Sequence, residues 1–576
     1  MTAAAADLRG VWVARWPEAV ALWSRWVQLR EPLWCETPKE SKKEGLSGSF
    51  AMLRLGDKSV VIALDQVRKL GLEEFPLEVL AHEAGHHVYC PADLSDQGRL
   101  LARIRRALPT KERHAGMVAN LYADMLINDR LQRQCGLDMA GLYKKLVAPD
   151  ADALWTFYMR TYEVLWGLAP GTLADPGKAA AVEGDARLAA RLARNYAKDW
   201  LGGAGRYASL CLTYLLKEPR QTMRSVASWE ELSATDADGN PVLPDGLAEM
   251  EPEEIEGAVH PSREETQPDG SKGLNPLGSR TTAGTHERGP IEYKELLEAM
   301  GARVGEVEAA RRYYKEKAVP HLVPFPVKET APAGDPLPEG LETWDAGSPL
   351  EEVDWFESAA KAGSVVPGYT TVKRTWGVSP GDTPERVPLD LYVGIDCSGS
   401  MVNPRLSLSY PVLAGTVIAL SALRAGARVM ACLSGEPGRA LATKGFVRDE
   451  TEVLSVLTDY LGTGYTYAVP RLWEGFPRKA ARPAHIFLVT DFDIFASLNG
   501  TGGEFPGAPR AGGWDIAKEA LARAGGGGTI VLHADPGALS QAAPRRLMKD
   551  GWDVHAVSDL AQLLAFARAF ARKTYA

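Results

Sequence analysis

The chain has 576 residues, of which 45% are hydrophobic and 24% are charged, and its formal net charge is −9. This length predicts several domains, and this composition excludes a fibrous or fully disordered chain. The negative balance, without a strongly basic stretch, argues against nucleic acid as the main partner.

The six cysteines are scattered and form no CxxC pair, which favours reduced thiols over a disulfide framework. The first residues lack a basic stretch followed by a long apolar run, and no stretch of about 18 apolar residues occurs. We therefore expect a cytoplasmic protein that does not enter a membrane.

Residues 1–228 are expected to form a mainly helical α+β domain. Trp12, Trp16, Trp23 and Trp26 recur at helical spacing and predict a stripe that faces a core. Two short β-type runs, joined by Gly56-Asp57, predict a hairpin over residues 50–64. Two helices are expected after it, one from about residue 76 to 90 and one from 110 to 134.

The middle of the chain changes composition. Between Glu230 and Asp269 there are 13 acidic residues and one basic residue, and Pro and Gly recur through Pro290. Residues 229–290 are therefore expected to be a disordered acidic linker, either a tether or an inhibitory strand across a cleft. Residues 291–386 read as a helical and irregular connecting region, with Trp344 and Trp355 as docking points.

Residues 387–576 show buried-type strands alternating with helices. This alternation predicts a parallel, doubly wound α/β sheet of Rossmann type. The expected strands are residues 389–395, 427–433, 485–490, 529–533 and 552–556.

A metal-binding motif, HExxH, lies in the first of the two expected helices. His82 and His86 are four residues apart, so both imidazoles can reach one zinc ion from one helix face. Glu83 is then placed to act as general base on a zinc-activated water. The alternative is a pair of histidines satisfied by carboxylates in a core.

A third ligand is expected in the second helix. Asn120, Asp124 and Asn128 share one face at i, i+4 and i+8, among apolar neighbours. A carboxylate in such surroundings needs a charge partner, and Asp124 is the favoured zinc ligand, with Asp129 and His114 in reserve. A salt bridge from Asp124 to Arg130 or Arg133 is the alternative. Asn120 and Asn128 are candidates for orienting ligands or holding a substrate backbone.

The HEAGHH segment followed by N-x-x-x-D-x-x-I-N resembles the zincin-type metallopeptidase domain that bacteria fuse to a C-terminal von Willebrand factor A-like (VWA-like) domain. The resemblance implies that His82, His86 and Asp124 are the metal ligands. This chain departs from the pattern at Gly85 and His87.

A second constellation combines three short motifs, each at the end of an expected strand. Asp396, Ser398 and Ser400 form DxSxS, residues 462–467 supply a threonine, and Asp491 ends a later strand. Loops at the carboxyl ends of parallel strands form the ligand crevice of such sheets. Hard oxygen ligands favour Mg²⁺, Mn²⁺ or Ca²⁺.

These motifs resemble the metal-ion-dependent adhesion site (MIDAS) of VWA domains. The resemblance implies that Thr466 is the threonine ligand, with Thr463 as the alternative, beside Asp396, Ser398, Ser400 and Asp491. Phe492 stands where the family usually has Gly. A partner's Asp or Glu can then complete the coordination of the metal.

The leading hypothesis is therefore a zinc-dependent peptidase whose VWA-like domain binds a protein partner. The resemblance implies that this partner is a MoxR-type AAA+ ATPase. The alternative is a non-catalytic adaptor in an ATPase-driven assembly or metal-insertion complex. Metal-dependent hydrolysis of a non-peptide bond is a third reading.

Overall fold

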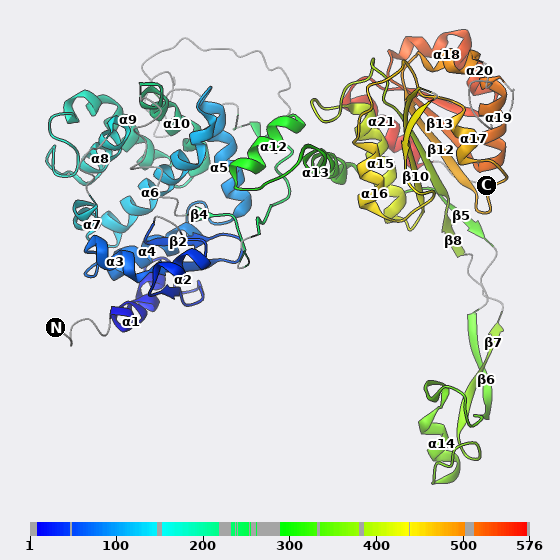
Figure 1. Ribbon diagram of the computed structural model, residues 1–576, viewed down its shortest axis with the longest axis horizontal. Coiled ribbons are helices and arrows are strands. Elements are labelled where there is room, and N and C mark those ends of the chain that lie inside the picture. The colour runs from blue at the N-terminus through cyan, green and yellow to red at the C-terminus, as the bar shows by residue number, and fades with distance from the viewer. Residues whose placement is uncertain are drawn as a thin grey trace. The chain divides into compact units, whose positions relative to one another are not determined.

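The chain folds as two units. The computed structural model describes residues 8–46, 49–146, 152–217, 232–236, 238, 240–252, 254, 261, 288–330, 335–379, 385–436, 438–500 and 512–572. The N-terminal unit comprises Met1–Lys317 with Pro404–Leu408, and the C-terminal unit comprises Ala318–Asn403 with Ser409–Ala576. The first is mainly helical and the second contains a six-stranded α/β sheet (Figure 1), as the sequence predicted.

The N-terminal unit combines one small sheet with many helices. Its helices are α1 (Leu8–Ala21), α2 (Pro38–Lys43), α3 (Leu64–Leu70), α4 (Pro76–Val88), α5 (Leu94–Ala107), α6 (Ala115–Gln134), α7 (Met139–Lys145), α8 (Ala153–Trp166), α9 (Ala179–Asn195), α10 (Trp200–Lys217), α12 (Pro290–Ala299) and α13 (Glu306–Ala318), with a 3₁₀ turn η1 (Glu112–His114). Its sheet has the order β1 (Leu33–Cys35), β3 (Ser59–Ala63), β2 (Ala51–Arg54) and β4 (Leu232–Ser233). The antiparallel pairing of β2 with β3 confirms the predicted hairpin.

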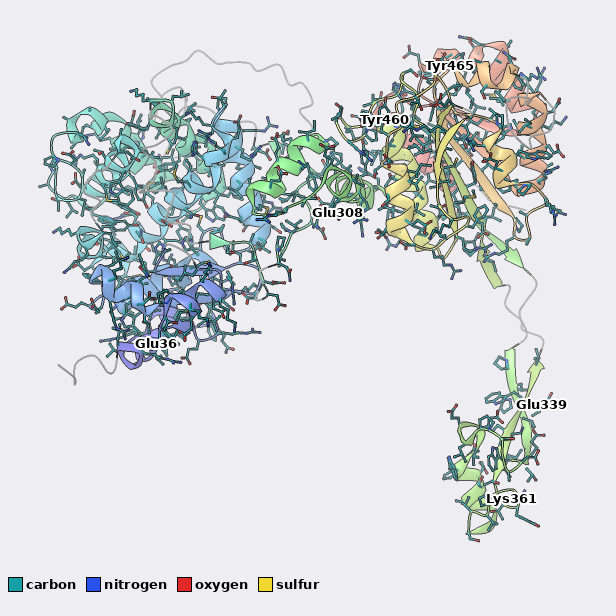
Figure 2. The ribbon with its side chains drawn as sticks, in the orientation of Figure 1. Glu36, Glu308, Glu339, Lys361, Tyr460 and Tyr465 are labelled. Atoms are coloured by element: carbon teal, nitrogen blue, oxygen red, sulfur yellow. The ribbon has the colours of Figure 1, made fainter. Side chains whose placement is uncertain are left out.

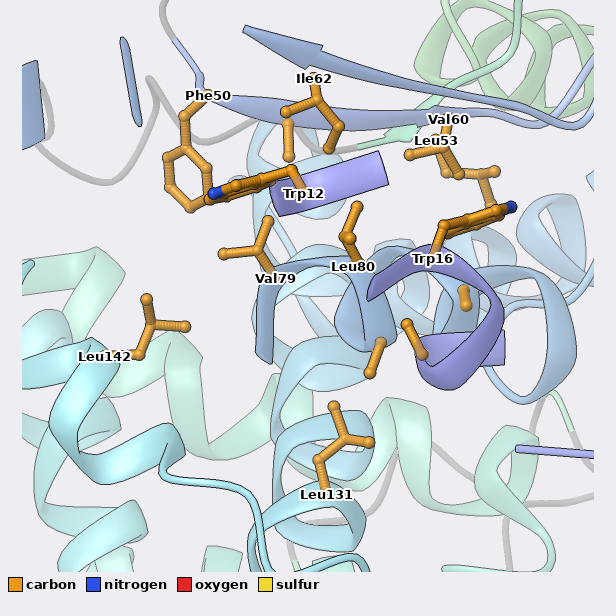
Figure 3. Packing of buried hydrophobic residues seen from close by; sticks show 14 of the residues in the cluster. Trp12, Trp16, Phe50, Leu53, Val60, Ile62, Val79, Leu80, Leu131 and Leu142 are labelled. Atoms are coloured by element: carbon orange, nitrogen blue, oxygen red, sulfur yellow. The ribbon is translucent and has the colours of Figure 1, made fainter. Parts of the chain in front are cut away.

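Tryptophans of α1 fill the space between this sheet and α4. Trp12 and Trp16 lie among Phe50 and Ile62 of the sheet side and Leu80 of α4 (Figure 3). Trp12 is fully buried, so its truncation to alanine is expected to cost about 3–5 kcal/mol. The predicted core-facing stripe is therefore confirmed for Trp12 and Trp16.

The stripe does not extend to its fourth member. Trp23 is buried, but Trp26 is 79% exposed, so the expectation that Trp26 faces the core is wrong. The reason is that α1 ends at Ala21, so helical spacing no longer sets the direction of Trp26. The guanidinium of Arg25 instead stacks over its ring, 4.8 Å from the centroid.

Helix α4, which carries HExxH, packs closely against its neighbours because of Gly85. A Cβ at this position would lie 2.5 Å from Trp23 and 2.8 Å from Ile127 of α6. The indole Nε1 of Trp23 also donates a hydrogen bond to the carbonyl of Ala81, at 2.6 Å. Glycine in HEAGHH thus allows α4 and α6 to approach, which brings their polar faces together.

Part of the expected acidic linker is packed on the N-terminal unit. Residues 232–236, 238 and 240–252, which we call the strap, begin with β4, which pairs in parallel with Leu53 and Arg54 of β2. Its buried Leu247 lies against Gly98 of α5. Arg103 of α5 forms a 2.5 Å ion pair with Glu251. Asp245 and Glu249 pair with Arg312 and Lys317 of α13, so three acidic side chains of the strap have basic partners. The strap therefore corrects the expectation of a self-repelling linker for these residues.

The C-terminal unit is built on a twisted sheet with helices on both faces (Figure 1). The sheet has the order β11 (Arg439–Ala442), β10 (Val429–Glu436), β9 (Asp390–Asp396), β12 (Ala484–Thr490), β13 (Gly525–Leu532) and β14 (Trp552–Ala556). The helices are α14 (Trp355–Ala362), α15 (Tyr410–Arg424), α16 (Glu450–Leu457), α17 (Arg471–Gly475), α18 (Ile494–Asn499), α19 (Gly513–Ala524), α20 (Ala542–Lys549) and α21 (Leu560–Ala571), with 3₁₀ turns η3 (Val319–His321), η4 (Leu350–Glu352) and η6 (Pro536–Ser540).

Five of these strands match the predicted ones and are parallel. The sixth, β11, was not predicted and runs antiparallel to β10 at the sheet edge, which makes the sheet mixed. Two antiparallel ribbons complete the unit, β5 (Val327–Thr330) with β8 (Glu385–Pro388) and β6 (Asp335–Thr343) with β7 (Val372–Ser379). Of the two expected docking points, Trp344 is buried and Trp355 is 54% exposed.

Among the described residues, no helix combines the length and apolar character needed to cross a membrane.

Candidate metal centres

The first candidate site lies between α4 and α6. His82 and His86 of α4 and Asp124 of α6 form the group of potential metal ligands found among the described residues. The two Nε2 atoms are 3.1 Å apart, and Asp124 Oδ1 lies 3.6 Å from Nε2 of His82 and 3.4 Å from that of His86. Helical spacing therefore predicted the third member of the group correctly.

The other nitrogen of each ring is held by a hydrogen bond. Nδ1 of His86 lies 3.0 Å from the carbonyl oxygen of Cys90, which can only accept, so Nδ1 carries the proton. Nδ1 of His82 lies 2.7 Å from Oδ1 of Asn128. In the neutral rings, both Nε2 lone pairs then face the centre of the site, toward the carboxylate.

The orientation of Asn128 is fixed by tyrosines. Its Nδ2 donates to the hydroxyls of Tyr143, at 2.9 Å, and Tyr162, at 2.8 Å, which leaves Oδ1 for His82. Tyr162 is in turn 2.7 Å from the hydroxyl of Tyr158. Asn128 thus fixes the orientation of the His82 ring, and its predicted role of orienting a metal ligand stays a prediction. The sequence analysis missed the tyrosines, because aromatic residues in an apolar helix read as core.

This donor set fits a divalent metal. Two lone pairs and a carboxylate point at one centre, and His86 and Asp124 are 0% and 4% exposed, so mutual repulsion there requires a cation or a shared proton. Two imidazoles and one carboxylate are ligands that zinc accepts. The alternative salt bridge is not formed with Arg133, which pairs with Asp129.

The other residues that the sequence analysis named for this site differ in their burial and in their partners. Asp129 is occupied by Arg133, and His114 forms the N-terminal cap position of α6, outside the His–His–Asp group. Glu83 is 1% exposed and lines a cavity of about 20 Å³ together with His82 and Asn128. Such a volume holds about one water molecule. Asn120 is 7% exposed and lines a separate, larger cavity.

The second candidate site lies where β9 and β12 end. Oγ of Ser400 donates to Oδ2 of Asp491 at 2.6 Å, and Oγ of Ser398 lies 3.1 Å from Oγ of Ser400. Asp396 is buried, and its Oδ1 accepts from the backbone N–H of Ser398 at 2.9 Å. The structure therefore brings together the first and third motifs of the predicted constellation.

Asp396 is held by further hydrogen bonds that the motif analysis did not include. Its Oδ2 accepts from Oγ1 of Thr490 at 2.6 Å and from the backbone N–H of Tyr467 at 2.9 Å. Burial raises the pKa of Asp396, hydrogen bonds from Thr490 and Ser398 oppose that rise, and the charge of Asp491 adds to it. A cation beside this carboxyl would favour its ionised form.

The threonine loop is also in place. Its backbone is held to β10 by the N–H of Thr466, which donates to the carbonyl of Gly435 at 3.2 Å. The hydroxyl oxygens of Thr463 and Thr466 are both buried and have no hydrogen-bond partner among the described residues. Buried hydroxyls without partners, beside serines and carboxylates, fit the oxygen ligands that Mg²⁺ requires.

The rim of this site is more accessible than its base. Ser400 is exposed and Asp491 is partly exposed, whereas Ser398 is fully buried. Tyr465, which is labelled in Figure 2, is 72% exposed on the threonine loop. The phenol of Tyr460 donates to the carbonyl of Met401 at 3.2 Å. A metal here would therefore be reachable by a side chain from another protein.

No family model matches the chain, and no curated protein matches it.

Proposed function

We propose that the N-terminal unit is a zincin-like, zinc-dependent peptidase domain and that the C-terminal unit is a VWA-like domain which binds a protein partner. The observation that carries the first part is the convergence of two imidazole nitrogens and a carboxylate within 3.1–3.6 Å, with both ring orientations fixed by hydrogen bonds. Three protein ligands leave a fourth position for water or substrate, as catalytic zinc sites do.

The chemistry that zinc supplies when bound is a lowered pKa of its water, to about 7, and polarisation of a carbonyl. Glu83, next to His82 on α4, accepts the proton of the attacking water and delivers it to the leaving amine. Asn128 and the carbonyl of Cys90 keep the two rings in the ligating orientation. The apolar side chains around Glu83, among them Val79 and Leu142, limit the entry of bulk water.

In the C-terminal unit, the proposed metal ligands are Asp396, Ser398, Ser400, Thr466 and Asp491, and the proposed ion is Mg²⁺, with Mn²⁺ or Ca²⁺ as alternatives. The accessible rim supports this proposal, because a partner's carboxylate can reach the position that the protein leaves open. The partner implied by the family resemblance, and proposed here, is a MoxR-type AAA+ ATPase.

A specific observation also favours a second function, that of a non-catalytic adaptor. His82, His86 and Asp124 are between 0% and 7% exposed, and the cavity beside Glu83 holds only about one water. A metal at so enclosed a site can stabilise the fold without turnover, leaving the C-terminal unit as the functional part.

The variant Glu83→Gln separates the two functions, with Glu78→Gln in the first turn of the same helix as control. We expect the zinc-loaded Glu83→Gln protein to keep its metal and to lose about 10²–10⁴-fold in cleavage of a peptide library followed by mass spectrometry. Glu78→Gln should retain cleavage. Absence of cleavage by the zinc-loaded wild type, with normal cellular function of Glu83→Gln, would establish the adaptor.

A further inference from the structure

Residues 336–378 of the C-terminal unit, which we call the ribbon module, leave most of their large apolar side chains exposed. The module consists of the β6–β7 ribbon, the turn η4 and helix α14, and Figure 2 labels two of its residues, Glu339 and Lys361. Its buried large apolar side chains are those of Trp344, Val353 and Val372. Ten others are exposed, and four of these are the aromatic side chains of Trp355, Phe356, Tyr369 and Trp376. Exposed apolar side chains gathered in so small a part of a chain indicate an interaction surface.

One face of the ribbon gathers three of the exposed side chains. Arg374, Trp376 and Val378 stand at alternate positions of β7, so their side chains share a face. Leu341 of β6 lies opposite Arg374 in the register and belongs to the same face. Leu341, Trp376 and Val378 are 47%, 60% and 74% exposed. Because a two-stranded ribbon is at best marginally stable in water by itself, an element that packs on this apolar face would stabilise it.

An acidic groove of about 650 Å³ includes Trp376 in its lining. Four carboxylates and two basic groups also line it, those of Glu342, Glu351, Glu352, Asp354, Lys373 and Arg374. Arg374 pairs with Asp354 at 2.6 Å, and Lys373 lies 3.3 Å from Glu342 and 3.7 Å from Glu352. The ribbon module as a whole has seven acidic and three basic residues, which gives it −4 of the net charge of −9 of the chain.

This charge decides which kind of partner can cover the apolar face. A nucleic acid or an anionic membrane would bring negative phosphate groups to a negative surface, and a second copy of the module would bring the same carboxylates. A basic protein segment matches both features of the surface. Its arginine side chains can pair with carboxylates and stack on the indole of Trp376, while its apolar side chains cover the ribbon.

We propose that the ribbon module is a docking surface for an arginine-containing segment of another protein. Arginine side chains of this segment enter the acidic groove beside Trp376, and apolar side chains pack on Leu341 and Val378. The proposal goes beyond the metal-dependent partner binding described above, because the surface includes none of the proposed metal ligands. The exposed aromatic side chains belong to the residue types that contribute most binding energy at protein interfaces.

The test selects ligands for the full chain from a library of random peptides displayed on phage. Peptides of about 12 residues are long enough to cover the ribbon, at about 3.3 Å per extended residue. Peptides that also bind the Trp376→Ser variant are removed. We expect the remaining peptides to be rich in arginine and to carry a net positive charge. Their affinity, measured by fluorescence anisotropy, should fall at least about tenfold in the double variant Glu351→Arg/Glu352→Arg.

Two matched controls should keep the affinity of the wild type. Trp26→Ser changes an exposed tryptophan of the N-terminal unit, and Glu73→Arg/Glu74→Arg reverses two adjacent exposed glutamates before α4. Circular dichroism and limited proteolysis show whether each variant is folded. The Glu351→Arg/Glu352→Arg variant leaves the sequence of the ribbon unchanged, so it remains informative if Trp376→Ser disturbs the ribbon.

Three outcomes would overturn the proposal. The first is that no peptide distinguishes the wild type from Trp376→Ser. The second is that the peptides which do so are neutral or acidic. The third is that charge reversal at Glu351 and Glu352 has no effect, or the same effect as reversal at Glu73 and Glu74, since attraction would then come from the charge of the whole chain.

Discussion

The two candidate metal sites differ in how the chain builds them. In the N-terminal unit the donors come from two helices, include two ring nitrogens, and are almost completely buried. In the C-terminal unit the donors are hydroxyl and carboxylate oxygens on loops at strand ends, with Ser400 and Asp491 reaching the surface. The first arrangement favours a borderline metal held in a shielded position, and the second favours a hard cation open to a partner.

The difference extends to what holds the ligands in place. His82 is held by a chain of side chains, Asn128 and then Tyr143 and Tyr162. Asp396 is held by two backbone N–H groups, those of Ser398 and Tyr467, and by one side chain, the hydroxyl of Thr490. The N-terminal site should therefore be the more sensitive of the two to substitutions of supporting side chains.

The largest effect is expected from His86→Ala. It removes one of three ligands, so zinc affinity should fall by more than the 10–100-fold typical of residues that only orient ligands. The matched control is His87→Ala, since His87 follows directly on α4 but is outside the His–His–Asp group. Zinc affinity is measured by competition with a chromogenic chelator. An equal loss in both variants would contradict the proposed ligand set.

The next largest effect is expected on the stabilisation of the protein by Mg²⁺ at the C-terminal site, and it is tested by substituting two neighbouring carboxylates. Mg²⁺ at 100 times its dissociation constant should stabilise the wild type by about 2.7 kcal/mol. Asp491→Ala should abolish this stabilisation, while Asp493→Ala, an exposed neighbour, should keep it. Thermal unfolding with and without Mg²⁺ measures both. Loss in both variants, or in neither, would show that Asp491 is not a specific ligand.

A smaller loss of zinc affinity is expected from a change to Asn128, which holds the ring of His82. Asn128→Leu removes the acceptor for Nδ1, so the ring loses its fixed orientation and zinc affinity should fall 10–100-fold. Asn195→Leu, at the end of α9, serves as control. If Asn128→Leu binds zinc as tightly as the wild type, the ring is positioned by packing alone.

The smallest loss of zinc affinity is expected from a change to the tyrosines that hold Asn128. Tyr143→Phe removes one of the two acceptors for Nδ2 of Asn128, and Tyr162 remains. Zinc affinity should fall about threefold to tenfold, the equivalent of one hydrogen bond. The double variant with Tyr162→Phe should approach Asn128→Leu. A full loss in Tyr143→Phe alone would indicate that the two tyrosines do not share the task.

The parts of the fold that the sequence predicted are those with local signals. The apolar runs of β9 and β12 and the helical spacing of His82, His86 and Asp124 are visible in short windows. The strand β11 was missed because its four residues are only partly buried and carry no periodic pattern. The docking of the strap was missed because its acidic residues pair with residues far away in the sequence, such as Glu251 with Arg103, which lies 148 positions earlier.

The same distinction between local and distant signals applies to the candidate sites. The proposed ligand residues could be named from the sequence because metal ligands have restricted types and spacings. The supporting groups could not, because a backbone carbonyl such as that of Cys90 has no sequence signature, and Thr490 looks like any other strand residue.

The central claim is that two imidazoles and one carboxylate of the N-terminal unit hold a metal. It is tested most directly by zinc K-edge X-ray absorption on the Asp491→Ala variant loaded with one equivalent of zinc, which avoids binding at the second site. We predict two imidazole nitrogens at about 2.0–2.1 Å and oxygen ligands at about 2.0–2.2 Å, without sulfur. A sulfur shell near about 2.3 Å, or the absence of imidazole scattering, would contradict the account.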